Sequence, residues 1–162
     1  MNGTIVSDAG PLHYLIIIGC ADALPELFGQ VLIPPSVRDE LLHASTPQKV
    51  KVWMENPPSW MKIEPVTRLH SLVRLHKGET AALQLALQSK ISTILMDDLD
   101  GRVAARRLGL MPIGTVGSLE RMAELGIIEL PTAITKLRQT NFFISPDLLD
   151  AALERDRRRR AF

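Results

Sequence analysis

The chain has 162 residues, of which 46% are hydrophobic and only 4% aromatic, and its formal net charge is +1. This length predicts a single domain over residues 1–162 with an aliphatic core, and the small charge excludes binding of nucleic acid through overall positive charge. A single cysteine, Cys20, excludes an internal disulfide framework and favours a reducing, cytoplasmic setting.

The first predicted element is a short buried strand that ends in a carboxylate. Ile5 and Val6 are β-branched and apolar, Asp8 follows them, and Gly10 and Pro11 then turn the chain toward a helix. In a parallel α/β sheet the C-terminal ends of the strands line the ligand crevice, so Asp8 is well placed for chemistry. The alternative is that Asp8 only caps the following helix, because Asp is a favoured N-cap residue.

Strands and helices then alternate along the chain. We predict helices over residues 12–18, 22–28, 36–42, 47–56, 77–87, 101–108, 116–125, 130–137 and 147–157, and strands over 31–33, 60–63, 93–96 and 111–113. This alternation predicts an α/β fold with a parallel sheet of four to five strands and helices on both faces. No signal peptide pattern opens the chain and the apolar run 15–18 is too short to span a bilayer, so we expect no membrane association.

Two predicted helices carry acids that border the core. Glu40 lies beside the apolar face of its helix and is either exposed to solvent or part of a site. Glu79 lies in the first turn of the Ala- and Leu-rich helix over 77–87, on the face that is predicted to be buried. An acid in a first turn also favours the helix dipole, which is the structural alternative for Glu79.

The strand over 93–96 repeats the pattern of the first strand, because Asp97 and Asp98 follow it directly. Two strands that end in carboxylates predict acids that converge at one edge of the sheet. The next helix carries Arg102 and Arg106 on its outer face, and Thr115 lies in a tight turn after the strand over 111–113.

The last predicted helix begins at Ser145 and Pro146, a favourable N-cap and first-turn pair. Its predicted buried stripe is Leu148, Leu149, Ala152 and Leu153. Positive charge gathers in a basic C-terminal tail over about 155–162. Such a run either contacts phosphates or is a solvated, frayed helix end.

The candidate chemistry rests on acids that are expected to meet at one place: Asp8, Glu40, Glu79 and Asp98, with Asp97 adjacent. Like charges repel one another, so a fold keeps such a cluster mainly where a cation neutralises it. Carboxylates with no His or Cys nearby suit Mg²⁺ or Mn²⁺ rather than zinc. These ions activate water and stabilise the charge that develops during phosphodiester cleavage.

Other chemistries have less support. The chain contains no Walker A, GxGxxG or GxSxG motif, and its four His residues show no metal-binding spacing. A receiver-like phosphoacceptor would need an Asp pair after the first strand and a lysine after the last one. Asp8 stands alone, and no lysine lies near Thr115.

Motifs from residue 5 to about residue 153 resemble the PIN domain, a family of metal-dependent ribonucleases that includes the toxins of many toxin–antitoxin pairs. The matching segments, in order, are residues 6–12, 33–41, 78–83, 95–98 with 101–102, and 114–117. Their order and spacing resemble a PIN-like branch related to those toxins. The resemblance implies a three-layer α/β/α fold with a central parallel sheet of four to five short strands.

The resemblance also implies the roles of individual residues. It implies catalytic acids at Asp8, Glu40, Glu79 and Asp98, and a Mg²⁺ or Mn²⁺ ion bound by these four and Asp97. Asp97 remains an alternative to Asp98 as the fourth acid, because Met96 stands where the family has a hydroxyl residue. The substrate-binding residues that we expect are Ser7, Arg102, Arg106 and Thr115.

The implied function is a divalent-metal-dependent ribonuclease that acts on RNA, with a cognate antitoxin protein and a second copy of the chain as expected partners. The expected dimer surface is the apolar region 11–28 together with Leu69, Leu72 and Leu75. The alternative is a PIN-fold module that binds RNA or protein with little catalysis, since a fold does not guarantee a function. The occupied acid positions favour the enzyme.

Overall fold

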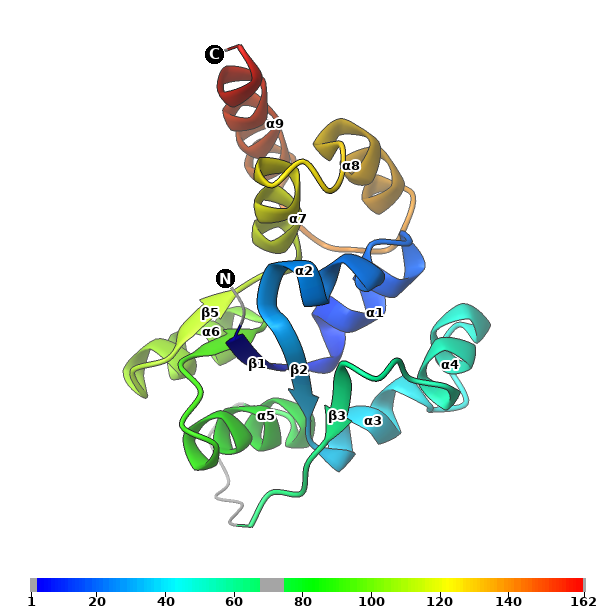
Figure 1. Ribbon diagram of the computed structural model, residues 1–162, viewed down its shortest axis with the longest axis vertical. Helices are drawn as coiled ribbons and strands as arrows, with labels where there is room; N and C mark the ends of the chain where they lie inside the picture. Colours follow the sequence, from blue (N-terminus) through cyan, green and yellow to red (C-terminus); the bar gives the residue numbers. More distant parts are fainter. Residues whose placement is uncertain (1–2, 68–74, 162) are drawn as a thin grey trace.

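A computed structural model describes residues 3–67 and 75–161. Its centre is a five-stranded parallel sheet in the order β3-β2-β1-β4-β5, with helices on both faces (Figure 1). The strands are β1 (Gly3–Ser7), β2 (Gly29–Ile33), β3 (Met61–Ile63), β4 (Thr93–Leu95) and β5 (Met111–Ile113). The predicted three-layer α/β/α class is confirmed.

The helices lie close to their predicted positions. They are α1 (Ala9–Ile17), the 3₁₀ turn η1 (Ala21–Ala23), α2 (Leu24–Phe28), α3 (Pro35–Leu41), α4 (Gln48–Glu55), α5 (Lys77–Gln88), α6 (Leu99–Arg107), α7 (Thr115–Glu124), α8 (Leu130–Arg138) and α9 (Pro146–Arg160). The starts of α1 and α6 were predicted too late. Their N-cap residues are Asp8, directly after β1, and Asp98, three residues after the end of β4. Leu69 and Leu72 lie outside the described residues.

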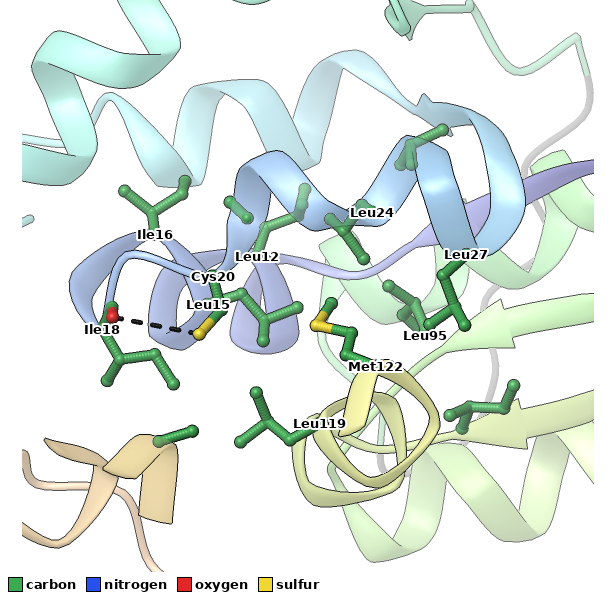
Figure 2. Packing of buried hydrophobic residues seen from close by; sticks show 14 of the residues in the cluster. Leu12, Leu15, Ile16, Ile18, Cys20, Leu24, Leu27, Leu95, Leu119 and Met122 are labelled. Carbon is green, nitrogen blue, oxygen red and sulfur yellow. Dashed lines mark hydrogen bonds between the residues drawn. The ribbon is translucent and has the colours of Figure 1, made fainter. Parts of the chain in front are cut away.

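The two faces of the sheet carry separate hydrophobic clusters, because successive strand residues point to opposite sides. Ile5 and Val31 join the larger cluster, which lies under α1, α2, α7 and α8. Figure 2 shows this packing, where Leu15 of α1 faces Leu119 of α7. Val6 of β1 faces the other way, into a smaller cluster covered by α5 and α6.

The apolar region 11–28 belongs to the larger cluster. Leu12, Leu15 and Leu24 are fully buried, and Cys20 is buried beside them. These side chains are used by the core of one molecule, and a dimer through this region stays a prediction. Within residues 3–67 and 75–161, no single helix has the length and apolar character to cross a membrane. The bent pair Ala9–Ile17 and Ala21–Phe28 together has the required length and composition.

The predicted buried stripe of α9 is confirmed at Leu149 and Ala152 and is wrong at Leu148. Leu148 is 58% exposed, whereas Leu149 and Ala152 are buried and Asp156 is only 4% exposed. The buried positions 149, 152 and 156 follow the helical repeat, which places Leu148 on the solvent side.

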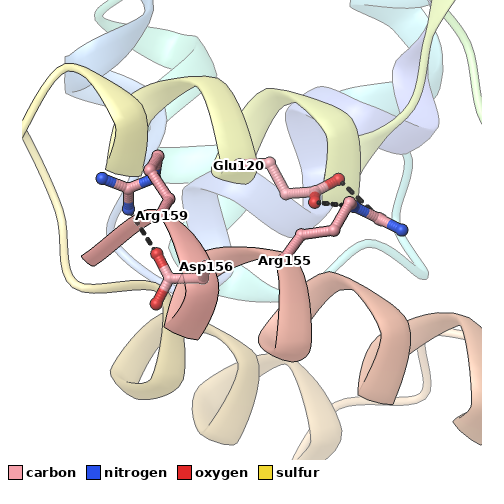
Figure 3. A network of polar contacts seen from close by, with 4 residues as sticks. All are labelled: Glu120, Arg155, Asp156 and Arg159. Atoms are coloured by element: carbon pink, nitrogen blue, oxygen red, sulfur yellow. Dashed lines mark hydrogen bonds and ion pairs between the residues drawn. The ribbon is translucent and has the colours of Figure 1, made fainter. Parts of the chain in front are cut away.

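The basic residues near the C-terminus continue α9 to Arg160. Arg155 donates hydrogen bonds of 2.8 and 3.2 Å to Glu120 of α7, and Asp156 pairs with Arg159 (Figure 3). Arg160 also lies 2.9 Å from the Asp156 carboxylate. The Arg155–Glu120 pair joins α9 to α7, and the Asp156 pairs lie within the last turns of α9, so this segment is not a frayed end.

The edge strand β5 has a proline at its centre. The Met111 N–H donates to the Ser92 carbonyl at 2.7 Å, and the Ile113 carbonyl accepts from the Met96 N–H at 2.9 Å. Because backbone groups alternate along a strand, those of Pro112 face away from β4. The proline therefore removes no hydrogen bond from the sheet.

Candidate active site

The predicted acids lie where several helices begin, at the C-terminal edge of the sheet. We refer to five residues as the acid cluster: Asp8, Glu40, Glu79, Asp97 and Asp98. Helices α1 and α7 start after the one residue that follows β1 and β5, respectively, and α6 starts after three residues that follow β4. The start of α5 lies beside Asp8, whereas Glu40 lies in the last turn of α3. Helix N-termini carry partial positive charge, which makes this edge a favourable place for carboxylates.

Asp8 is buried at the end of β1, with 7% of its surface exposed. It holds the N-cap position of α1, but its side chain makes no capping hydrogen bond. Burial raises the pKa of Asp8 to about 7, and the charges of Glu79, Glu40 and Asp97 add to this rise. The capping alternative therefore does not account for Asp8, whose carboxylate stands among other acids.

Glu40 approaches Asp8 across Gly78. A Cβ atom at Gly78 would lie 3.8 Å from both Asp8 Oδ1 and Glu40 Oε2, so these two oxygens are no farther apart than twice that distance. Glu40 itself is exposed on α3. The glycine at this position leaves open the space between the two carboxylates.

Glu79 points inward, as predicted, and is only 8% exposed. Its carboxylate accepts a hydrogen bond from the His76 backbone N–H at 3.4 Å, which closes the first turn of α5. Burial raises the pKa of Glu79, and the charge of Asp98 raises it further, whereas His76 lowers it. The expectation that no His lies near the acids was wrong at His76.

Asp97 is held by two hydrogen bonds from one residue at the start of α7. The Thr115 N–H donates to Asp97 Oδ1 at 2.7 Å, and the Thr115 hydroxyl donates to Oδ2 at 2.6 Å. Burial raises the pKa of Asp97, while these bonds and the charge of Arg102 lower it. Gly114 makes this approach feasible, because a Cβ there would lie 2.8 Å from Asp97 Oδ1. The sequence indicated a turn at Gly114 but not this contact.

Asp98 has the capping role that was considered for Asp8. It is exposed, and its Oδ2 accepts a hydrogen bond of 3.0 Å from the Gly101 N–H in the first turn of α6. Met96, on the other side of Asp97, is fully buried in the smaller cluster. A Cβ at Gly101 would overlap the Met96 sulfur, so the glycine provides the space for this side chain.

The predicted substrate-binding residues have mixed positions. Ser7 and Thr115 are fully buried, and the Ser7 hydroxyl donates to the Asp8 carbonyl at 2.8 Å, so neither side chain is open to a substrate. Arg102 is half-buried rather than on the outer face, because its Nη1 donates to the Met96 carbonyl at 3.0 Å. Arg106 is exposed, as expected.

The donor chemistry of the acid cluster suits a hard cation. Asp8, Glu79 and Asp97 are carboxylates whose pKa values are raised by burial, and they form no ion pair with Lys or Arg within the described ranges. Such groups favour an oxygen-binding ion such as Mg²⁺ or Mn²⁺. In the same part of the chain, no three acidic, His or Cys side chains converge closely enough to bind one ion together.

Replacing Thr115 with Val is expected to loosen Asp97. The variant keeps the backbone hydrogen bond and the side-chain shape but loses the hydroxyl donor, at a cost of about 1–3 kcal/mol of folding free energy. Because the hydroxyl favours the ionised carboxylate, the loss should be larger at neutral than at acidic pH. Thermal melts at the two pH values measure it, with the exposed Thr135→Val as control. Equal losses at both pH values would contradict this role.

Comparison with known proteins gives one family. A family model described as a PIN domain matches residues 4–157. No curated protein and no solved structure gives a significant match to the chain. PIN domains are generally nucleases and generally use divalent metals. Because the match spans the sheet, the helices around it and all five acids, the chain belongs to the PIN domain family and has its nuclease-type fold.

Proposed function

We propose that this protein is a divalent-metal-dependent ribonuclease whose active site is the acid cluster. The observation that carries the proposal is Asp8, a carboxylate buried at a strand end with the charges of Glu79, Glu40 and Asp97 acting on it. A folded chain gains nothing from such repulsion unless a cation offsets it. In a nuclease-type fold, that cation is the group that promotes phosphodiester cleavage.

The residues that would hold Mg²⁺ or Mn²⁺ are Asp8, Glu79 and Asp97, with Glu40 at the exposed side. A bound divalent ion would supply an activated water and neutralise the charge on the scissile phosphate. Thr115 keeps Asp97 oriented through its two hydrogen bonds. Arg106, exposed on α6, is placed to contact phosphates of the RNA.

We assign the fourth acid position to Asp97 rather than Asp98. Asp97 is bonded to Thr115 and its charge acts on the buried Asp8, whereas Asp98 caps α6 and its charge acts on Glu79. Asp97→Asn should lower the cleavage rate by about a hundredfold or more, while Asp98→Asn, which keeps a favoured capping residue, should lower it less than about tenfold. Single-turnover cleavage of both variants measures this, and the reverse order would move the assignment to Asp98.

The proposed function is tested by incubating the full chain with end-labelled single-stranded RNA and Mg²⁺, Mn²⁺ or EDTA. Cleavage that requires the metal supports the proposal. RNA that is bound but stays intact at every metal concentration would favour the second candidate, a binding module of the same fold. That candidate is favoured by the absence of a ready three-ligand arrangement in the described residues.

The resemblance to toxins extends the proposal to partners. We propose that the protein acts as the toxin of a toxin–antitoxin pair, with a cognate antitoxin protein, and that it forms a homodimer. These proposals rest on the order and spacing of the motifs alone. Co-expression with a small protein encoded next to it, followed by size-exclusion chromatography with light scattering, tests both.

A further inference from the structure

A groove of about 920 Å³ extends from the acid cluster along α7. Asp97 and Gly114 line its inner end, and Glu124, at the last turn of α7, lines its outer end. The ten residues of α7 span about 15 Å, so the groove continues well beyond the acids. Its opposite wall is formed by α9 and by the loop between α8 and α9.

An exposed aromatic ring stands on this groove. Phe143, in the loop between α8 and α9, has 98% of its surface exposed, although it is a large apolar side chain. Its neighbour Phe142 packs edge-on against Tyr14 of α1, with ring centroids 4.8 Å apart. The Tyr14 hydroxyl donates to Asn141 Oδ1 at 3.0 Å. The loop is therefore anchored on α1 at the two residues that precede Phe143.

The charges along the groove favour an anionic occupant. Outside the acid cluster, four arginines and three carboxylates line it: Arg102, Arg121, Arg155, Arg159, Glu120, Glu124 and Asp156. Arg155 neutralises Glu120, and Asp156 is paired with Arg159 (Figure 3). Asp156 is also paired with Arg160. Arg102, Arg121 and Glu124 have no ion-pair partner among residues 3–67 and 75–161. The Arg102 Nη1 is bonded to the Met96 carbonyl, so its other N–H groups and the Arg121 guanidinium are left for phosphates.

We propose that this groove binds the part of a single-stranded RNA that leaves the acid cluster, and that Phe143 stacks on one of its bases. The inference rests on the proposed function, since the same strand must reach the acids. The groove continues from Asp97, carries arginines that can bind phosphates, and bears an anchored, exposed ring. Proteins that bind single strands combine such basic grooves with aromatic rings on which bases stack. A protein segment, the other occupant, would depend on the aliphatic neighbours Leu99 and Leu148 instead.

The test is fluorescence anisotropy with a short labelled single-stranded RNA, in EDTA so that metal-dependent cleavage does not consume it. Phe143→Ala should weaken binding about 5- to 150-fold, the range for loss of one stacked base. Phe143→Trp should keep the wild-type affinity, and Phe143→Leu should behave like Phe143→Ala because it retains apolar area without a ring. Val52→Ala, an exposed apolar residue on α4, is the matched control.

A second probe isolates stacking from other contacts. With an RNA that lacks bases along its length, wild type and Phe143→Ala should bind equally. The inference is overturned if Phe143→Ala binds the intact RNA as tightly as wild type. It is also overturned if Phe143→Leu keeps the wild-type affinity while Leu148→Ala weakens binding. Base-dependent binding through Phe143 without any cleavage would uphold it and reject the ribonuclease. Metal-dependent cleavage and binding that are unchanged by substitution of Phe143 would support the ribonuclease and overturn the inference.

Discussion

Asp8→Asn is expected to abolish metal-dependent RNA cleavage while leaving the fold intact. Asn has nearly the shape of Asp, but it removes the charge at the centre of the acid cluster. Loss of a ligand that positions the metal should lower the cleavage rate by at least about a hundredfold. Single-turnover kinetics with saturating Mn²⁺ measure this loss, and circular dichroism confirms folding.

The matched control is Asp22→Asn, which removes the same charge from an exposed position in η1. It should cut RNA at the wild-type rate. If Asp8→Asn and Asp22→Asn are equally active, the acid cluster is not the site of cleavage. If wild type is inactive as well, the ribonuclease proposal itself fails, and the two results are therefore distinguishable.

The same Asp8→Asn variant is expected to melt at a higher temperature than wild type when no metal is present. In the folded protein, burial raises the pKa of Asp8 from 3.8 to about 7, so the folded state retains a proton that the unfolded chain releases. Stability is therefore unaffected by Asp8 below pH 3.8, falls as pH rises between 3.8 and about 7, and stays low above that. The full cost is about 4 kcal/mol, at 1.36 kcal/mol per pKa unit.

Glu79 and Asp97 act in the same direction, because burial raises the pKa of both. Removing the Asp8 charge should thus raise the melting temperature in EDTA at neutral pH by about 5 °C or more. Wild type should gain about 2.7 kcal/mol from Mn²⁺ at a hundredfold excess over Kd, and the variant should gain less. Scanning calorimetry of both proteins with EDTA and with Mn²⁺ measures these shifts.

At acidic pH the two proteins should melt alike, which serves as the internal control. A variant that melts below wild type in EDTA, and that gains as much from Mn²⁺, would assign Asp8 a structural role. The kinetic and thermal experiments are independent, because the first measures the rate of RNA cleavage and the second measures the effect of the repulsion among the acids on stability.

Local pattern was enough to predict the layers of the fold. Ile5 and Val6 alternate between the two faces of β1, and α5 has an Ala- and Leu-rich run. Both patterns can be recognised within a few neighbouring residues. The stripe of α9 was wrong at Leu148, because Leu148 and Leu149 are equally apolar and both were assigned to the buried face. Only packing against α7 decides which of the two is buried.

The candidate site was predicted in outline and not in its details. Asp97 and Asp98 are adjacent and identical in type, so no local pattern states which one faces the other acids. Their directions depend on Thr115 and Gly101, which follow 18 and 3 residues later, respectively. Phe143 gave no signal, because an exposed ring in a loop has meaning only once the groove beside it is known.

The proline at the centre of β5 also limits how copies of this chain can meet. A neighbouring molecule that tried to add a strand to this open side of the sheet would find no N–H at the middle position, because Pro112 has none. Proline and short length are two devices that protect such sides from intermolecular strand pairing and hence from aggregation. A homodimer joined by extending the sheet through β5 is therefore disfavoured, and one built from helix surfaces is compatible with this protection.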